Sequence, residues 1–313
     1  MIPLLVIAGP TASGKTKVAA VTARLLNGEI ISADSMQVYR YMDIGSAKPD
    51  MLERQGIAHH LIDIVDPDAD FTAAIYQKAA REAICNVHLR GYIPILTGGT
   101  GFYIDAVLYD YDFSGAEADP EFRSAMWKKA ELEGNKALHN LLREVDPLAA
   151  AQIHVNDLKR IVRALEIQKQ TGAAGNLCRT NHRQIYPQYN TLFIGLCYQR
   201  ELLYQRIEKR VDLMLQRGLV EEVQYLLDRG YHSGLNSMQG LGYKEIASFL
   251  AEEYTLEEAG QMLKRNTRRF AKRQLTWFKR YSSIKWIDME KYDTIEEVAE
   301  EIGRLWRSCR ETL

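Results

Sequence analysis

The sequence has few cysteines. Only four occur in 313 residues, and they are scattered along the chain: Cys85, Cys178, Cys197 and Cys309. The absence of a close pair argues against a disulfide framework and against a thiolate metal site. We expect each cysteine to be a small buried hydrophobic side chain.

Long apolar runs are also missing. No run approaches the ~18 residues that a membrane span requires. The apolar opening from Ile2 to Ala8 has no basic region before it and is interrupted at Gly9, so it predicts a buried strand and not a secretory signal. We therefore expect a cytoplasmic protein with no membrane partner.

The sequence has no overall excess of one charge. Lys plus Arg number 40 and Asp plus Glu 41, so the formal net charge of -1 gives no indication of a nucleic-acid partner. Basic residues are nevertheless concentrated locally, with eleven against four acidic ones in residues 159–217 and eight against none in residues 264–280. Hydrophobic residues at 46% and charged residues at 26% are ordinary for a globular protein and exclude global disorder.

Short β-rich runs alternate with helical patterns in the first hundred residues. The strand-like runs are residues 3–8, 29–33, 60–65 and 92–97, and the helical ones are residues 15–26 and 72–89. Thr72 is a candidate N-cap, and Gly91 lies just past the end of its helix. This order predicts a parallel sheet with right-handed crossovers.

Charged helical sequence follows Tyr109. Helical patterns over residues 120–142 and 157–170 indicate an insertion, after which we expect strands at 191–197 and 284–287 and helices at 201–216, 256–281 and 294–307. The fold class is therefore α/β, with a P-loop-type parallel sheet core flanked by helices and a mostly helical insertion domain. The expected divisions are the first part of the core at 1–112, the insertion at 113–190, and the rest of the core with basic C-terminal helices at 191–313.

A phosphate-binding loop is the clearest motif. Residues 9–16, GPTASGKT, match the pattern G-x-x-x-x-G-K-[ST] between a predicted strand and a predicted helix. Glycines allow backbone amides to converge on phosphate oxygens, Lys15 adds a full charge, and the Thr16 hydroxyl can hold Mg²⁺. The predicted ligand-binding residues are Gly9, Pro10, Thr11, Ala12, Ser13, Gly14, Lys15 and Thr16.

The loop predicts a polyphosphate ligand without identifying it. ATP-hydrolysing enzymes usually carry a second acidic magnesium ligand at the end of a neighbouring strand. The candidate strand at 92–96 ends in TGGTG without a carboxylate, and Asp63 follows only a short apolar run. ATP hydrolysis is therefore poorly supported.

Asp34 directly follows the second predicted strand. Ligands of open α/β sheets bind at the carboxyl ends of strands, so we expect Asp34 near the phosphate loop. Its neighbours Ser35, Met36, Gln37 and Tyr39 combine polar groups with apolar surface, which suits a bound base. The alternative is a turn aspartate that caps the next helix.

Six ordered sequence blocks resemble the tRNA dimethylallyltransferases, also called tRNA isopentenyltransferases, in their bacterial form. The blocks are GPTASGKT from Gly9, DSMQVY from Asp34, MDIGSAKP from Met42, GGTGFY from Gly98, NDLKRIVRALEI from Asn156 and RRFAKRQLTWF from Arg268. We expect the bacterial form, because these 313 residues contain no match to the zinc-finger extension of eukaryotic members. The resemblance implies transfer of a dimethylallyl group from dimethylallyl diphosphate to N6 of adenosine 37 in tRNA.

The resemblance also implies roles for individual residues. The phosphate loop would bind the diphosphate with Mg²⁺, Asp34 would act as the general base, and Thr11 would assist positioning. An arginine in residues 206–210 would stabilise the departing diphosphate; we favour Arg210, with Arg206 as the alternative.

The partner implied by the resemblance is the anticodon stem-loop of tRNA, from which the target adenine must leave its stack. The residues expected to contact tRNA are Asp34, Ser35, Met36, Gln37, Thr100, Arg123, Lys159, Arg160, Ile161, Val162, Arg163, Gly240, Gly242 and Lys244. Leu263, Phe270 and Trp277 recur every seven residues and predict a helix stripe. We expect Phe270 and Trp277 to be core anchors.

Three other functions compete with this interpretation. A P-loop small-molecule kinase would share Lys15 and Thr16 but release ADP. An adenylate isopentenyltransferase would use a mononucleotide and need no large basic surface, and an RNA-binding module would leave the phosphate loop unexplained. We expect a monomer, and the spacing of His59, His60 and His154 fits no standard metal site.

Overall fold

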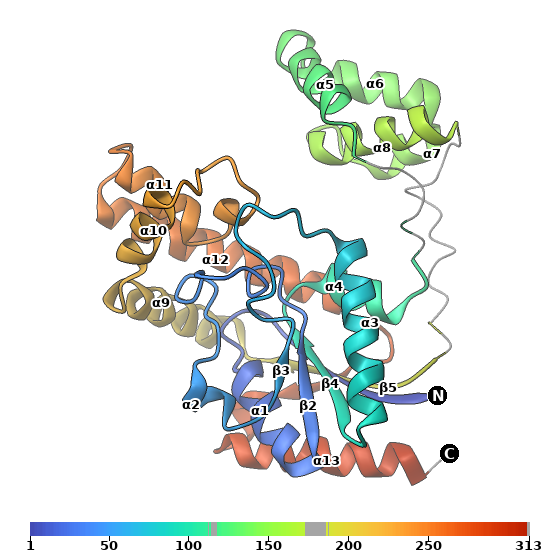
Figure 1. Cartoon of the computed structure of the whole chain (residues 1–313), viewed down its shortest axis with the longest axis vertical. Coiled ribbons are helices and arrows are strands. Elements are labelled where there is room, and N and C mark those ends of the chain that lie inside the picture. Colours follow the sequence, from blue (N-terminus) through green and yellow to red (C-terminus); the bar gives the residue numbers. More distant parts are fainter. Residues whose placement is uncertain (112, 114–117, 173–185, 187, 312–313) are drawn as a thin grey trace. The chain divides into compact units, whose positions relative to one another are not determined.

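In the computed structural model, residues 1–111, 113, 118–172, 186 and 188–311 are described. They form two units, which are coloured by sequence in Figure 1. Unit 1 comprises Met1–Leu108 and Pro187–Leu313, and unit 2 comprises Tyr109–Tyr186. Unit 2 is therefore a single insertion in the sequence of unit 1.

A parallel sheet forms the centre of unit 1. Within the described residues it has six strands in the order β3-β2-β4-β1-β5-β6. The strands are β1 (Ile2–Ala8), β2 (Gly28–Ser32), β3 (His59–His60), β4 (Ile93–Gly98), β5 (Tyr189–Cys197) and β6 (Lys285–Asp288). Because every pair is parallel, all carboxyl ends lie at one edge of the sheet, and the sheet with its flanking helices confirms the expected α/β fold.

Helices cover both faces of the sheet. Consecutive residues of β1, Leu4 to Ile7, point to alternate faces and are all fully buried. One face packs against α1 (Lys15–Leu26) and α13 (Ile295–Glu311), as the shared apolar cluster of these helices with β1, β4 and β5 shows. The helices α3 (Ala73–Leu89) and α4 (Gly101–Leu108) pack with each other, and α3 also contacts β1, β2 and β4. The short α2 (Met51–Arg54) follows the loop after β2.

A second apolar cluster in unit 1 is helical. It joins the segment after β2, including Val38 and Met42, to residues of α9 (Arg200–Gln216), α10 (Leu219–Asp228), α11 (Tyr243–Leu250) and α12 (Leu256–Phe278). Figure 1 shows these four helices as one group beside the sheet. The loop after β2 is thereby fixed between the sheet and this group.

Unit 2 is a small helical bundle with its own core. It contains α5 (Pro120–Glu133), α6 (Asn135–Val145), α7 (Pro147–Gln152) and α8 (Leu158–Thr171). Three of the four helices begin at acidic N-caps: Asp119, Asp146 and Asp157 accept backbone hydrogen bonds at the starts of α5, α7 and α8. Leu138, Leu142 and Leu165 lie in its buried apolar cluster.

Several predicted elements differ from the structure for identifiable reasons. The expected strand at 60–65 is only two residues long, because Leu61 and Asp63 adopt left-handed backbone conformations that end the pairing. The expected helix at 120–142 is two helices separated by Gly134, whose φ is 83°. The helices α4, α10 and α11 were not predicted, and α12 ends at Phe278 and not at residue 281.

The cysteine prediction was partly wrong. Cys85 is exposed on α3, while Cys197 and Cys309 are half-buried, and all three are free thiols. Cys178 lies outside the described residues. In the part of the chain that is described, no helix is long and apolar enough to cross a membrane.

Candidate active site

A pocket lies at the carboxyl ends of three adjacent strands. It measures about 310 Å³ including its open mouth, and it is lined by the following residues: Lys15, Thr16, Ile30, Ser32, Asp34, Gln37, Pro49, His59, Ile62, Thr97 and Gly98. Residues from the ends of β1, β4 and β2 meet here because β4 lies between the other two strands. The phosphate loop and Asp34 therefore serve one pocket, as the sequence predicted from their positions after strands.

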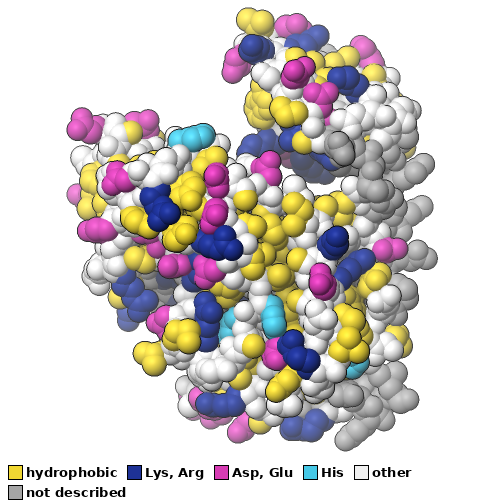
Figure 2. All heavy atoms as spheres, in the orientation of Figure 1, with side chains coloured by type: hydrophobic (Ala, Val, Ile, Leu, Met, Phe, Trp, Pro, Cys, Tyr) yellow, Lys and Arg dark blue, Asp and Glu magenta, His cyan; other side chains and the backbone are white. Residues whose placement is uncertain are grey.

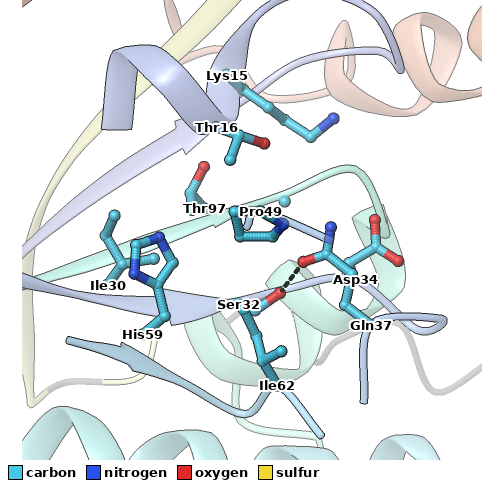
Figure 3. Close-up of a pocket in the computed structure, with 11 residues that line it drawn as sticks. Lys15, Thr16, Ile30, Ser32, Asp34, Gln37, Pro49, His59, Ile62 and Thr97 are labelled. Atoms are coloured by element: carbon cyan, nitrogen blue, oxygen red, sulfur yellow. Dashed lines mark hydrogen bonds between the residues drawn. The ribbon is translucent and has the colours of Figure 1, made fainter. Parts of the chain in front are cut away.

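Figure 3 shows how the charged groups face one another. Lys15 and Thr16 lie on one side of the pocket, and Asp34 and Gln37 lie on the other, with the Asp34 carboxylate directed toward the Lys15 side chain. A cation that can hold an anionic ligand and a carboxylate that can accept a proton therefore share one space.

The backbone of the phosphate loop is shaped for an anion. Ala12 and Gly14 have positive φ angles of 62° and 85°, which turn neighbouring amide groups toward a common side. The loop then enters α1, whose N-terminus adds partial positive charge. A Cβ atom at Gly9 would lie 2.9 Å from the carbonyl oxygen of Leu196, so glycine is required for the loop to approach β5 this closely.

Lys15 carries a charge that no described residue neutralises by an ion pair. Its ammonium donates to the carbonyl oxygen of Pro10 over 3.4 Å, and it forms no ion pair with any described residue. Loss of water around the ammonium lowers the pKa of Lys15 to about 8; Asp34 opposes this shift, and Arg210 adds to it. A bound anion would restore the favourable environment of the charged form.

The two candidate arginines differ in what they contact. Arg206 donates from Nε to the carbonyl oxygen of Ala12 at 2.9 Å, and its guanidinium lies over the Tyr198 ring. Arg210 makes no hydrogen bond or ion pair with a described residue, and burial lowers its pKa while Asp34 raises it. Arg206 thus supports the phosphate loop, while the Arg210 charge stays available close to Lys15 and Asp34.

Asp34 forms a turn and leaves a free oxygen. Its Oδ1 accepts a hydrogen bond from the Met36 backbone at 3.0 Å, which orients the carboxylate without capping a helix. Thr100, expected to contact tRNA, binds Ser35: its Oγ1 accepts from the Ser35 backbone at 3.0 Å, and its hydroxyl donates to Ser35 Oγ at 3.3 Å. The end of β4 therefore holds the Asp34 turn in place.

Gln37 is bonded to the segment of residues 43–49, which contributes Pro49 to the lining of the pocket. Its Nε2 donates to the carbonyl oxygen of Ala47 at 3.3 Å, and its Oε1 accepts from the Ser32 hydroxyl at 3.1 Å. That segment is in turn anchored by Glu222 of α10, whose carboxylate accepts from three consecutive backbone amides, those of Asp43, Ile44 and Gly45, at 2.7–3.0 Å. Three bonds to one carboxylate fix the wall of the pocket.

Two predicted tRNA-contact blocks meet in unit 1. A Cβ atom at Gly240 would lie 2.4 Å from the Met36 Cε, so the glycine allows the block at 240–244 to approach the block at 34–37. Gly242 has a φ of 93° at the start of α11, and the ammonium of Lys244 lies 3.7 Å from Glu245.

Figure 2 shows acidic and basic side chains interspersed on the drawn face of unit 1. The electrostatic potential of this face is therefore not dominated by charge of one sign.

The predicted contacts of unit 2 fall into buried and exposed groups. Ile161 and Val162 lie in its core, so their side chains stabilise the unit and do not reach solvent. Arg123 donates from Nε and Nη2 to the buried Glu166 at 2.8 and 2.9 Å, and Arg163 also binds Glu166. Lys159 and Arg160 are exposed on α8.

Sequence reasoning missed several residues of the pocket. Ser32, Pro49 and Thr97 line it, and so does His59, which was assigned to no site from the sequence. Gln274 of α12 was also missed, although it bonds to the phosphate loop. Nothing in a polar residue's type reveals that its helix will pack against a distant loop.

The donor set suits magnesium bound together with a phosphate group. The described residues contain no cluster of three or more His, Cys, Asp or Glu side chains that could hold a metal alone. The Thr16 hydroxyl nevertheless lines the pocket beside Lys15. Mg²⁺ commonly takes one or two protein oxygens and completes its shell with phosphate oxygens and water, so a single hydroxyl at this position fits an ion that is bound together with a diphosphate.

Two family models match the sequence. The model of the family described as IPP transferase matches residues 37–281, and the one described as Isopentenyl transferase matches residues 2–67. A curated relative from Pelotomaculum thermopropionicum, a tRNA dimethylallyltransferase, is 51% identical over 303 residues, which is 96% of each chain. A second, from Alkaliphilus oremlandii, bears the same description and is 50% identical over 95% of each chain.

Solved structures agree with these sequence matches. The full-length tRNA isopentenylpyrophosphate transferase of Bacillus halodurans superposes with a TM-score of 0.74 at 43% identity and covers 100% of this chain and 99% of that one. A eukaryotic dimethylallyltransferase acting on tRNA gives a TM-score of 0.78 at 30% identity, over 92% of this chain and 74% of that one. The extent of these matches confirms the resemblance found in the sequence, and the chain belongs to the IPP transferase family.

Proposed function

We propose that the chain transfers a dimethylallyl group from dimethylallyl diphosphate to N6 of adenosine 37 in tRNA and releases diphosphate. One observation carries this proposal: a phosphate-binding loop and a carboxylate from the next-but-one strand face the same pocket. The relatives described as tRNA dimethylallyltransferases support the same substrates. A diphosphate donor and an amine acceptor need these two kinds of group close together.

Bond making and bond breaking divide between the two sides of the pocket. The N6 lone pair attacks the allylic C1, the bond from C1 to the diphosphate oxygen breaks, and its electron pair leaves with the diphosphate. Lys15 and Arg210 stabilise the negative charge that grows on the leaving group, with Arg206 supporting the loop. Thr11, at the start of this loop, helps to position the reactants.

The proton lost from N6 goes to Asp34. The lone pair of an adenine amine is delocalised into the ring, so the amine is a weak nucleophile, and its proton becomes acidic only as N6 bonds to the allylic C1; Asp34 accepts the proton at that point. The Asp34 oxygen that is not bonded to Met36 is the acceptor. Mg²⁺ held at Thr16 would neutralise part of the diphosphate charge.

tRNA contacts come from both units in this proposal. The proposed contacts in unit 1 are Asp34 to Gln37, Thr100, Gly240, Gly242 and Lys244, of which Asp34 and Gln37 line the pocket. In unit 2, the exposed Lys159 and Arg160 would bind backbone phosphates, while Glu166 fixes Arg123 and Arg163. The acceptor is the anticodon stem-loop, which implies a cytoplasmic enzyme, and we propose that it acts as a monomer.

Label transfer tests this function directly. The protein is incubated with Mg²⁺ and dimethylallyl diphosphate labelled in the allyl group, together with an anticodon stem-loop, AMP or no acceptor. We expect label in the stem-loop alone. Label in AMP would favour an adenylate isopentenyltransferase, and ADP formation from ATP would favour a kinase; either result in place of stem-loop labelling contradicts the proposal.

A further inference from the structure

Gln274 is one of two buried polar residues on the inner face of α12, and unlike Thr267 it does not bond to its own helix. Its side chain is 6% exposed, and the neighbouring turns of the helix bury Ala271 and Phe278 completely. Burying an amide is unfavourable unless its donor and acceptor both find partners. The partners of Gln274 therefore explain its position.

Both ends of the Gln274 amide bind loops of the pocket. Oε1 accepts a hydrogen bond from the Thr11 backbone at 2.8 Å, and Nε2 donates to the carbonyl oxygen of Gly99 at 2.8 Å. Thr11 belongs to the phosphate loop after β1, and Gly99 belongs to the turn after β4. One side chain thus joins the loops that follow two neighbouring strands.

The contact at Gly99 leaves no spare room. A Cβ atom on this residue would lie 2.3 Å from the Gln274 Nε2 and 3.5 Å from the Lys15 Nζ. The Gln274 amide and the Lys15 ammonium therefore both approach the Gly99 turn. Ala12 and Ala271 also belong to one apolar cluster, so apolar packing accompanies the hydrogen bond between α12 and the loop.

We propose that Gln274 is a positioning residue for the transfer reaction. It holds the start of the phosphate loop and the Gly99 turn at a fixed spacing around Lys15, and it thereby sets the affinity of the pocket for the diphosphate end of the donor. The inference rests on the proposed function only in its choice of donor, because binding of inorganic diphosphate tests the same geometry without transfer.

Substitutions at position 274 separate positioning from simple stabilisation. Gln274→Glu keeps an acceptor for the Thr11 amide, loses the donor to Gly99, and adds a negative charge beside the anion site. Gln274→Ala removes both bonds. Gln261→Glu, at an exposed position on the same helix, is the matched control.

Gly99→Ala approaches the same contact from the other loop. The added methyl group displaces the Gln274 amide, and the φ of Gly99 lies outside the left-handed region, so the backbone accepts alanine. In the Gln274→Ala background the shorter side chain leaves room for the methyl group. We therefore expect Gly99→Ala to have little further effect in that background.

The experiment measures three quantities for each variant: the Kd of inorganic diphosphate with Mg²⁺ by calorimetry, the KM and kcat for dimethylallyl diphosphate with an anticodon stem-loop, and the Kd of the stem-loop. We expect about tenfold weaker diphosphate binding and a similar rise in donor KM for Gln274→Glu and Gly99→Ala, with stem-loop affinity and the Gln261→Glu control unchanged.

Two results would overturn the inference. In one, the Gln274 variants are less heat-stable but retain the parent's diphosphate Kd and donor KM, which is the signature of a purely structural residue. In the other, Gly99→Ala and Gln274→Ala have additive effects on donor KM. If the parent protein binds diphosphate but labels no stem-loop, the proposed function fails while the calorimetric test of Gln274 stands.

Discussion

Both units keep charged groups partly or fully out of water, but described residues neutralise Glu166 of unit 2 by ion pairs and leave Lys15 and Arg210 of unit 1 without one. In unit 2, Glu166 is fully buried and binds Arg123, Arg163 and the backbone of Asp119. In unit 1, Lys15 lines the pocket and Arg210 acts on that lysine electrostatically, and neither has an acidic side chain bonded to it among the described residues. A satisfied buried charge stabilises a fold, whereas an unsatisfied one at a pocket marks a place where a ligand supplies the missing partner.

The electrostatic environments of the two regions support this distinction. Burial alone would raise the pKa of Glu166, but hydrogen bonds from Arg123, the Asp119 backbone and Arg163 hold it below its ordinary value. For Lys15 the loss of hydration outweighs the attraction of Asp34 and lowers the pKa to about 8. The protein therefore favours the charged form of Glu166 and disfavours the charged form of Lys15 in the absence of ligand.

The largest expected effect follows removal of the proton acceptor in the pocket. Asp34→Asn keeps the Oδ1 that accepts from Met36 but cannot take the N6 proton, so kcat should fall about 100- to 10,000-fold. Single-turnover labelling of the stem-loop measures this loss, and stem-loop affinity should stay within about twofold of the parent. A variant with near-normal turnover would remove Asp34 from the base role.

Removing the Glu166 carboxylate, which is paired with two arginines, should lower the stability of the chain without changing the chemistry of the pocket. Glu166→Gln leaves two arginines without their carboxylate and should lower the free energy of unfolding by about 3 kcal/mol. Denaturant unfolding of the variant and of an exposed control, Glu131→Gln, measures the difference. Unchanged stability would mean that the Glu166 cluster is dispensable for the fold.

The Glu166 carboxylate also predicts how the free energy of unfolding depends on pH. Its pKa is lower in the folded chain than the ordinary value of 4.5, so the stabilisation is present above that pH and is lost as the pH falls below it. Glu166→Gln should therefore flatten the acid limb of stability against pH. An acid limb identical to that of the parent would assign acid unfolding to other groups.

Removing the unneutralised cation should weaken anion binding without unfolding the chain. Lys15→Met loses a charge-assisted contact and should raise the Kd of inorganic diphosphate roughly 10- to 100-fold, while Lys15→Arg, which keeps the charge, should lose less. Calorimetry measures both. Because Lys15 is unfavourably desolvated, Lys15→Met should unfold at the same or a higher temperature; a large loss of stability would contradict the contrast between the units.

The smallest effect concerns the exposed basic residues. Simultaneous Lys159→Ala and Arg160→Ala changes should weaken stem-loop binding severalfold and reduce the slope of log Kd against log salt by about 0.7–0.9 for each lost phosphate contact. Arg304→Ala, in an exposed pair with Glu301, serves as the control. A slope equal to that of the parent would exclude both residues from the tRNA contact.

Local patterns in the sequence predicted much of the core. The helix at 15–26 was predicted to the residue, and Thr72 caps α3 as expected, because both depend on nearby residues alone. The phosphate loop and Asp34 were brought together correctly, since the carboxyl ends of parallel strands share one edge. These predictions needed no knowledge of distant contacts.

The helix α12 shows where sequence patterns fail. Hydrophobic spacing predicted a stripe of Leu263, Phe270 and Trp277, but the last two are only half-buried. The buried face instead contains Thr267, whose hydroxyl bonds to its own helix, and Gln274, which bonds to two distant loops. Burial of these polar residues depends on partners far away in the chain, so hydrophobicity could not reveal it.

The central claim is that the phosphate loop and Asp34 act on one pair of reacting atoms. A structure of the chain with an anticodon stem-loop and a non-transferable thio-analogue of dimethylallyl diphosphate measures this directly. We predict the diphosphate against Lys15, the adenine N6 within about 3.5 Å of the allylic C1, and Asp34 within hydrogen-bond reach of N6. A diphosphate bound away from residues 9–16, or an adenine that does not reach Asp34, would contradict the account.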